Sequence, residues 1–544
     1  MSRERRLWIS GVVLVYFVVS VVGLFSFGLT DDDDFYIPAG VSQARWLGQL
    51  VSLSGLSRAA IDSAFTVNHE HPPFAKYVFG ICHFAFHEWL GPFRAARVGT
   101  VLFSTLTAFM MMILASRHLS GRRGLWVGTS AVAMMLTLPR FFFHSHAATL
   151  DVPVTAMYLV AATFALLGER SVKYAIWVGP IFGLATATKL NAPFLLLAYV
   201  PFAVLVRWGR SGGDGESGLS LPPVPLALLS MLTLGPIVFF LVWPWMWFDT
   251  VARVAAYVGF HAKHYGIHFL YFGRIYTSDP FAPWHAPFVT AALTTPVATL
   301  VLFFAGAISG ASRVIQRLRA RFGTDDDARR EGDFVLFVAL NAITTIGVVA
   351  FAGTPIYGGE KLFMPFFPFL CLLAAYGLER AVALIPYPPG ASMVVAALLS
   401  TSGLSLVIEH GEYGLSSFNG LAGGLSGATA LGMERQYYDV AFLELPRLLS
   451  KEAPRNLKVH FLPNNWEYAR TYRYYRDAGI LRSDIRVVER PEDADWIVIT
   501  HERRFARYSE DLSRYRDRKI LHEAIVDGTP VWSLLDVRAT ARSN

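Results

Sequence analysis

The sequence has little charge. Only 16% of its 544 residues are Asp, Glu, Lys or Arg, whereas 53% are hydrophobic. Because about a quarter of the residues of an ordinary soluble protein are charged, this composition excludes a soluble enzyme of this length. It predicts a chain that crosses a membrane many times.

Cysteine is nearly absent. Cys82 and Cys371 lie far apart in apolar surroundings, so the sequence indicates neither a disulfide framework nor a cysteine-rich metal cluster. His69 and His71 could bind a metal, but two histidines at i and i+2 are a weak signal. We therefore expect no required cofactor; a divalent metal is not excluded, but nothing indicates one.

A basic binding surface is also lacking, although the net charge is +7. Residues 409–544 carry 20 Lys and Arg against 20 Asp and Glu, so the whole excess lies in residues 1–408. No basic stripe there is interleaved with the stacking aromatics that single-stranded nucleic acids require. We read the positive charge as loop charge on one membrane face and expect no nucleic-acid partner.

Long apolar runs are what the sequence has in abundance. About eleven approach the roughly 20 residues that span a bilayer, at 7–28, 95–116, 124–140, 149–168, 174–189, 191–207, 222–244, 286–309, 333–352, 361–378 and 390–408. A twelfth run, 74–90, is short and carries four ionisable side chains, so we expect an amphipathic helix lying at the interface. The sequence thus predicts a polytopic α-helical membrane protein with about eleven transmembrane helices.

Arginines in the loops set the orientation. With eleven spans and a cytoplasmic N-terminus, nearly every basic cluster faces the cytoplasm, as the positive-inside rule expects; examples are Arg122, Arg123, Arg313, Arg317 and Arg380. Counting 74–90 as a span would reverse every later segment and place Arg313 and Arg317 outside. We therefore predict that the chain following the last span is extracytoplasmic.

This topology brings an acidic stretch to the outer face. Four aspartates, Asp31 to Asp34, follow the first apolar run directly. Since an aspartate at the bilayer centre costs roughly 2.5 to 3.5 kcal/mol, the run must lie at the membrane surface. A carboxylate there can act as a general base. A solvated stop signal is the alternative, above all for Asp31 and Asp34.

Further ionisable residues lie at the outer ends of spans. Asp151 is either functional or a helix cap before Pro153. Lys189 suits a phosphate or pyrophosphate group, although a lysine at a membrane rim can simply extend to the water. The same two readings stay open for the cations Arg94, Arg97 and Lys361.

The composition changes from about residue 409. Segments at 457–462, 485–488 and 496–500 read as strands and 467–479 as a helix, and Asp527-Gly528-Thr529-Pro530 is a hairpin signal. We predict that residues 409–544 form a small α/β domain outside the membrane.

The order of these motifs resembles that of a known family. Asp32-Asp33-Asp34-Phe35-Tyr36 and then His71-Pro72-Pro73-Phe74-Ala75-Lys76 are similar to the outer-loop motifs of GT-C glycosyltransferases of family 39, the protein mannosyltransferase and aminoarabinose transferase type. Arg94 or Arg97 opens the second span, Leu150-Asp151 opens a later one, and Thr188-Lys189 ends another. Aspartate replaces the family's glutamate at Asp33, and the run of four leaves the register of the base open by one residue.

The resemblance implies a GT-C catalytic domain over residues 1–408, with residues 29–94 as an outer loop containing interfacial helices, and an extracytoplasmic domain over 409–544. It implies a glycosyltransferase of the bacterial inner membrane that moves a sugar, with inversion, from a polyprenyl-phosphate donor to a lipid or protein acceptor. Asp32 would be the base, with Asp33 and Asp151 as further catalytic acids. The implied substrate-binding residues are Tyr36, His71, Lys76, Arg94, Arg97, Lys189 and Lys361.

Two other functions were weighed against this one. A transporter or flippase of lipid-linked sugars is expected to bury charges near mid-membrane, often in repeated halves. Here no repeat is seen and the ionisable residues lie at span ends, which favours the transferase. A receptor or scaffold that binds a partner through residues 409–544 is the third hypothesis.

Overall fold

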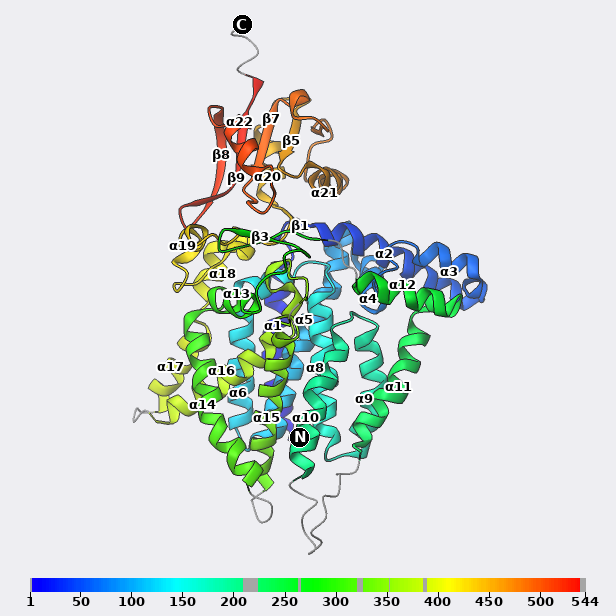
Figure 1. Ribbon diagram of the computed structural model, residues 1–544, viewed down its shortest axis with the longest axis vertical. Coiled ribbons are helices and arrows are strands. Elements are labelled where there is room, and N and C mark those ends of the chain that lie inside the picture. The colour runs from blue at the N-terminus through cyan, green and yellow to red at the C-terminus, as the bar shows by residue number, and fades with distance from the viewer. Residues whose placement is uncertain are drawn as a thin grey trace, which may run out of the picture.

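The computed structural model describes residues 2–208, 224–262, 266–319, 326–351, 353–384 and 389–538. Long helices form a bundle, shorter helices gather at one end of it, and a small sheet domain lies beyond them (Figure 1). The N-terminus lies at the opposite end of the bundle from the sheet domain (Figure 1). An odd number of membrane crossings produces this arrangement.

Six helical stretches in the described part of the chain are long and apolar enough to cross a membrane. They are α1 (Arg3–Gly23), α5 (Pro92–His118), α8 (Asp151–Gly168), α14 (Val297–Arg319), α16 (Phe366–Ala383) and Gly390–Ser416, which includes α17 (Pro389–Ser400) and α18 (Leu404–His410). The shorter helices α6 (Arg123–Leu136), α9 (Val172–Thr186), α10 (Leu195–Trp208) and α11 (Leu226–Val242) and the longer but more polar α15 (Asp326–Gly347) complete the bundle. All the predicted apolar runs are largely helical, and the polytopic helical fold is confirmed.

Two of the predicted runs are broken helices. The run 286–309 divides into α13 (Ala286–Thr294) and α14 because Pro296, between them, has no N–H to donate and disfavours the helical conformation of the residue before it. The run 390–408 bends near Gly403, where a Cβ atom would lie 2.0 Å from the carbonyl oxygen of Thr137. Only glycine lets the chain approach α6 so closely.

Four helices form a cap at the end of the bundle nearest the sheet domain: α2 (Asp31–Gln49), α3 (Arg58–Phe65), α4 (Phe74–Leu90) and α12 (Thr250–Ala262) (Figure 1). Helix α4 is the predicted 74–90 segment, and it is not among the helices of spanning composition. It packs on α2 through two glycines, since a Cβ atom on Gly80 would lie 2.0 Å from the carbonyl oxygen of Gly40.

The sheet domain contains a five-stranded sheet in the order β6-β5-β7-β9-β8. Its strands are β5 (Lys458–Leu462), β6 (Arg486–Val487), β7 (Trp496–Thr500), β8 (Lys519–Val526) and β9 (Thr529–Asp536), with α20 (Glu444–Glu452), α21 (Asn465–Asp477) and α22 (Tyr508–Arg514) packed around them. Strands β5, β6 and β7 are parallel, and β8 and β9 form the predicted hairpin. At its turn, Asp527 and Gly528 have φ of 46° and 72°, as such two-residue turns require.

A two-residue ladder joins the sheet domain to the cap. Strand β1 (Leu29–Thr30) pairs antiparallel with β4 (Val440–Ala441). Because β1 leads directly into α2, the acidic run is anchored from both sides, by the membrane bundle below and by the sheet domain above.

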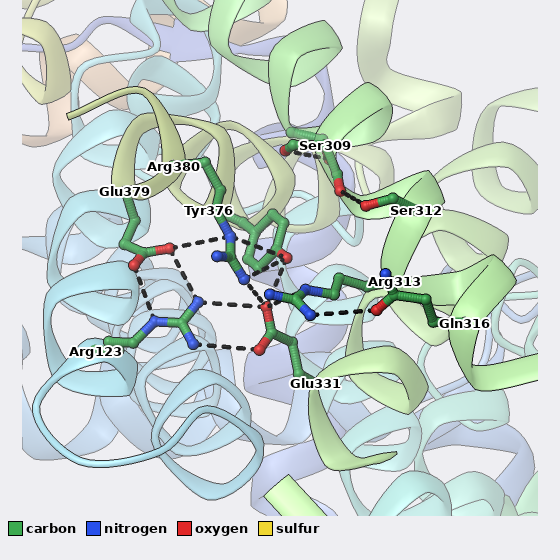
Figure 2. Close-up of polar contacts among 10 residues, drawn as sticks. Arg123, Ser309, Ser312, Arg313, Gln316, Glu331, Tyr376, Glu379 and Arg380 are labelled. Carbon is green, nitrogen blue, oxygen red and sulfur yellow. Dashed lines mark hydrogen bonds and ion pairs between the residues drawn. The ribbon is translucent and has the colours of Figure 1, made fainter. Parts of the chain in front are cut away.

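Arginines and carboxylates meet at the bundle end far from the sheet domain. Figure 2 shows Glu331 of α15 at the centre of this network. Its partners are Arg123 at 3.2 Å, Arg313 at 3.8 Å, Arg380, and the hydroxyl of Tyr376 at 2.7 Å. This carboxylate thus joins cations from three other helices, α6, α14 and α16, and Glu379 supplies a second negative charge to Arg123 and Arg380.

Replacing this carboxylate tests its role in stability. We expect Glu331→Gln to lower the free energy of unfolding by roughly 1–3 kcal/mol, because the partly buried guanidinium groups lose one carboxylate partner, and Arg123 and Arg380 are left with Glu379 alone. Thermal unfolding in detergent measures the change. The control is Gln316→Ala, which removes only a contact to Arg313 on α14; a Glu331→Gln melting temperature equal to that of the control would contradict the expectation.

Candidate active site

The acidic run forms the first turn of α2. The hydroxyl of Thr30 accepts a hydrogen bond from the Asp33 N–H at 3.4 Å, and the Asp33 carboxylate accepts one from the Thr30 N–H at 2.8 Å. Carboxylates are favoured in a first turn by the helix dipole. Because successive helical residues point about 100° apart, the four aspartates face different surroundings.

Asp33 is buried in an ion pair with Arg97 of α5. Its carboxylate accepts hydrogen bonds from Arg97 Nε at 2.9 Å, from Arg97 Nη2 at 2.6 Å and from the Ala148 N–H at 2.8 Å. Burial alone would raise the pKa of Asp33, but Arg97 and the hydrogen bonds from Thr30 and Ala148 lower it below its ordinary value. Neither Asp33 nor Arg97 lines the cavity described below; the structure places both in this buried ion pair.

Asp31 and Asp34 face the sheet domain. Arg470 of α21 lies 3.7 Å from Asp31 and also contacts Asp34. Its guanidinium group is held between the rings of Phe35, at 4.3 Å, and Trp466, at 4.2 Å. This ion pair and its two aromatic neighbours fasten α21 to α2.

Asp32 lines a cavity of about 320 Å³ between the end of the bundle and the sheet domain. Four other predicted site residues line it as well: Tyr36, His71, Lys189 and Lys361. Tyr36 is in α2, His71 lies just before α4, Lys189 follows the end of α9, and Lys361 lies in the turn before α16. The cavity therefore gathers residues that are up to about 330 positions apart in the sequence.

Two lysine–aspartate pairs lie at the cavity: Asp32, Lys189 and Lys361 line it, and Asp151 contacts Lys189 without lining it. Lys361 Nζ donates to Asp32 Oδ2 at 2.6 Å, and Lys189 Nζ donates to Asp151 Oδ1 at 2.5 Å. Burial alone would lower the pKa of Lys361, but Asp32 and Asp151 raise it above its ordinary value. Lys361 therefore remains a cation. Two cations beside two carboxylates can bind a phosphate and still leave a base for proton transfer.

A short turn with two glycines positions Lys361. It lies in the 3₁₀ segment η5 (Gly359–Phe363). Gly358 and Gly359 precede it with φ of 64° and 61°, a left-handed conformation that other residues adopt only with strain. The turn directs the lysine into the cavity.

The remaining predicted residues lie nearby but do not line the cavity. Lys76 is fully buried and donates to the carbonyl oxygens of Asn68 at 2.7 Å and His71 at 2.8 Å, so it shapes the loop that carries His71. Burial lowers the pKa of Lys76 to about 7, against the opposing effect of Glu70. The guanidinium group of Arg94 lies over the rings of Phe25 and Phe93.

Residues of the sheet domain and its connecting segment also line the cavity, although they belong to no motif recognised in the sequence: Tyr438, Asp439, Glu467 and Arg504. Arg504 pairs with Asp439 at 2.6 Å. These positions meet the acidic run only because β4 pairs with β1. The one local sequence feature that could have pointed to these cavity-lining residues is the Tyr437-Tyr438-Asp439 stretch just before β4.

We expect Asp32 and Asp33 to contribute differently to the stability of the protein. We expect Asp33→Asn to lower the free energy of unfolding by roughly 3–5 kcal/mol, because it leaves the fully buried Arg97 without its counter-ion. The partly exposed Asp32 is the matched control, one residue away and changed in the same way, and Asp32→Asn should cost far less. Thermal unfolding of the two variants side by side decides this; equal melting temperatures would contradict the assignment.

No protein-family model matches this sequence, and a search of curated proteins finds no match. Solved structures do resemble it. ArnT from Cupriavidus metallidurans bound to undecaprenyl phosphate is 14% identical with a TM-score of 0.50, over 97% of this chain and 98% of that chain. The apo state of that protein gives 15% identity and a TM-score of 0.50, over 97% of each chain. The oligosaccharyltransferase AglB from Archaeoglobus fulgidus, in complex with an inhibitory peptide and a dolichol-phosphate, is 11% identical with a TM-score of 0.46, over 100% of this chain and 76% of that chain.

The likeness to ArnT extends over nearly the whole of both chains, including the sheet domain. It confirms the GT-C fold of a polytopic membrane protein. It does not distinguish family 39 from other families of that fold.

Proposed function

We propose that this protein is an integral membrane glycosyltransferase, which transfers a sugar from a polyprenyl-phosphate donor to an acceptor at the outer face of the bacterial inner membrane. The observation that carries the proposal is the convergence of Asp32, Lys361 and Lys189 on one cavity at the end of the bundle, with Asp151 hydrogen-bonded to Lys189. The ArnT structure of the same fold was obtained with undecaprenyl phosphate, which is a ligand of the kind that two lysines would bind.

In the proposed reaction the donor's phosphate binds Lys189 and Lys361. Asp32 accepts the proton of an acceptor hydroxyl while that oxygen attacks the anomeric carbon of the sugar. The bond between that carbon and the phosphate oxygen breaks, and polyprenyl phosphate leaves with the electron pair. Attack from the opposite face inverts the anomeric centre. The lysines stabilise the charge that develops on the leaving phosphate, so the step does not need a metal ion.

Tyr36 and His71 are placed to contact the sugar. Both line the cavity, and their ring centroids lie 5.8 Å apart in an edge-to-face arrangement. Burial and the charge of Lys76 keep the pKa of His71 well below its ordinary value. A neutral imidazole can both donate and accept hydrogen bonds, as recognition of sugar hydroxyls requires.

An apolar groove offers a place for the polyprenyl tail. It encloses about 330 Å³ between α13, α14, α15 and α16, and its lining includes Phe288, Leu300, Ile346 and Phe366. Phe366 is the first residue of α16 and follows Lys361 by five positions. A tail in this groove would remain in the lipid phase while its phosphate extended toward the lysines.

The decisive variant is Asp32→Asn. We expect it to lower the rate of sugar transfer by about 10² to 10⁴, the usual contribution of a general base, while the protein still folds and inserts. Transfer from a polyprenyl-phosphate sugar in proteoliposomes measures it, with product identified by mass spectrometry. Glu331→Gln, at the far end of the bundle, controls for damage to the fold. Full activity of Asp32→Asn would refute the proposed base, and lipid-linked sugar flux without any product would favour a flippase.

The proposed orientation is tested by cysteine labelling in spheroplasts. Cys82 and Cys371 are both buried, which keeps background labelling low. We expect Glu489→Cys in the sheet domain to react with a membrane-impermeant maleimide, because it is exposed on the proposed outer side. Arg122→Cys, at the other end of the bundle, should react only after lysis. The reverse pattern would overturn the orientation and with it the periplasmic site.

A further inference from the structure

Tyr438 contacts both members of the catalytic ion pair. Its hydroxyl accepts a hydrogen bond from Lys361 Nζ at 3.4 Å, and it interacts electrostatically with the carboxylate of Asp32. The Lys361 ammonium also lies 4.5 Å from the centre of the tyrosine ring. Burial and the nearby carboxylates raise the pKa of Tyr438 well above its ordinary value, so the hydroxyl keeps its proton and can donate to Asp32.

A second layer of buried polar side chains lies behind this group. Glu360, adjacent to Lys361, accepts a hydrogen bond from Arg140 Nη1 at 2.9 Å and lies 3.5 Å from His144 Nε2. The ring of His144 packs on that of Tyr438, with centroids 5.9 Å apart. Glu360, Arg140 and His144 are each at most 3% exposed. This layer fixes both the backbone of Lys361 and the ring of Tyr438.

The proposed reaction places an additional demand on Asp32. The Lys361 ammonium donates a hydrogen bond to Asp32 at 2.6 Å. A donor phosphate that draws the lysine toward itself weakens this contact at the moment when the carboxylate must face the acceptor hydroxyl. A catalytic base that is free to rotate is less effective, because orientation contributes much of the rate. Asp32 therefore needs a second partner that does not move.

We propose that Tyr438 is this partner, a positioning residue whose hydroxyl holds Asp32 in place while Lys361 is engaged by the donor phosphate. Glu360, with Arg140 and His144, supports the tyrosine and the lysine from behind. The inference rests on the proposed function and adds to it, because neither the tyrosine nor the buried layer belongs to any motif noted in the sequence. It also gives the segment that joins the last span to the sheet domain a role in the reaction.

Tyr438→Phe tests the proposal because it removes only the hydroxyl and keeps the ring stacked on His144. We expect kcat to fall by about 10- to 100-fold, the range for a lost hydrogen bond to a charged group, with the donor KM changed by less than about twofold. The matched control is Tyr413→Phe. Its hydroxyl contacts Glu444 and Trp532 within the sheet domain, and its kcat should equal that of the wild type.

Glu360→Gln tests the supporting layer with a different signature. Because it loosens the turn that carries Lys361, we expect the donor KM to rise by about tenfold or more, together with a fall in kcat. Wild-type kcat in Tyr438→Phe would overturn the positioning role. So would a loss of kcat matched by a fall in melting temperature and a rise in donor KM, since this pattern indicates a merely structural tyrosine. A wild-type protein without transfer activity would instead overturn the proposed function, and the inference with it.

Discussion

The buried ion pair between Asp33 and Arg97 is the interaction on which the site depends. Both side chains are at most 2% exposed, so neither can leave the other without a large cost in free energy. The pair fixes the rotation of α2 about its axis. Once Asp33 faces α5, helical geometry turns Asp32 toward the cavity and brings Asp31, which also lines the cavity, and Asp34 to Arg470. The pairing of one aspartate thus sets the surroundings of its neighbours.

The sheet domain is part of the site and not an appendage. It pairs β4 with β1, it clamps α2 through Arg470, and it supplies Glu467 and Arg504 to the wall of the cavity. A cavity at the end of a helix bundle is otherwise open to water on one side. Closing it with a domain gives the lysine–aspartate pairs surroundings in which electrostatic interactions are stronger than in bulk solvent.

Sequence reasoning reached much of the architecture and about half of the candidate site. Apolar runs, loop arginines and the Asp527-Gly528 turn are local signals, and the helices and the hairpin follow them. Asp32, Lys189 and Lys361 stand out by their position at the outer ends of spans, and Tyr36 and His71 by the outer-loop motifs of the resembled family; all five line the cavity. Arg97 could not be separated from these by sequence, because a cation at a span end looks the same whether it faces a substrate or a buried carboxylate.

The sequence by itself determined that this chain threads a membrane and keeps its charged residues at the ends of the spans, because inserting a charge into lipid is costly wherever it occurs in the chain. Only the tertiary structure decided the partner of each charge. Four adjacent aspartates are chemically identical until the fold sets Arg97 beside one, Lys361 beside another and Arg470 beside two. Tyr438 joins them through contacts between segments hundreds of residues apart, which no local pattern encodes.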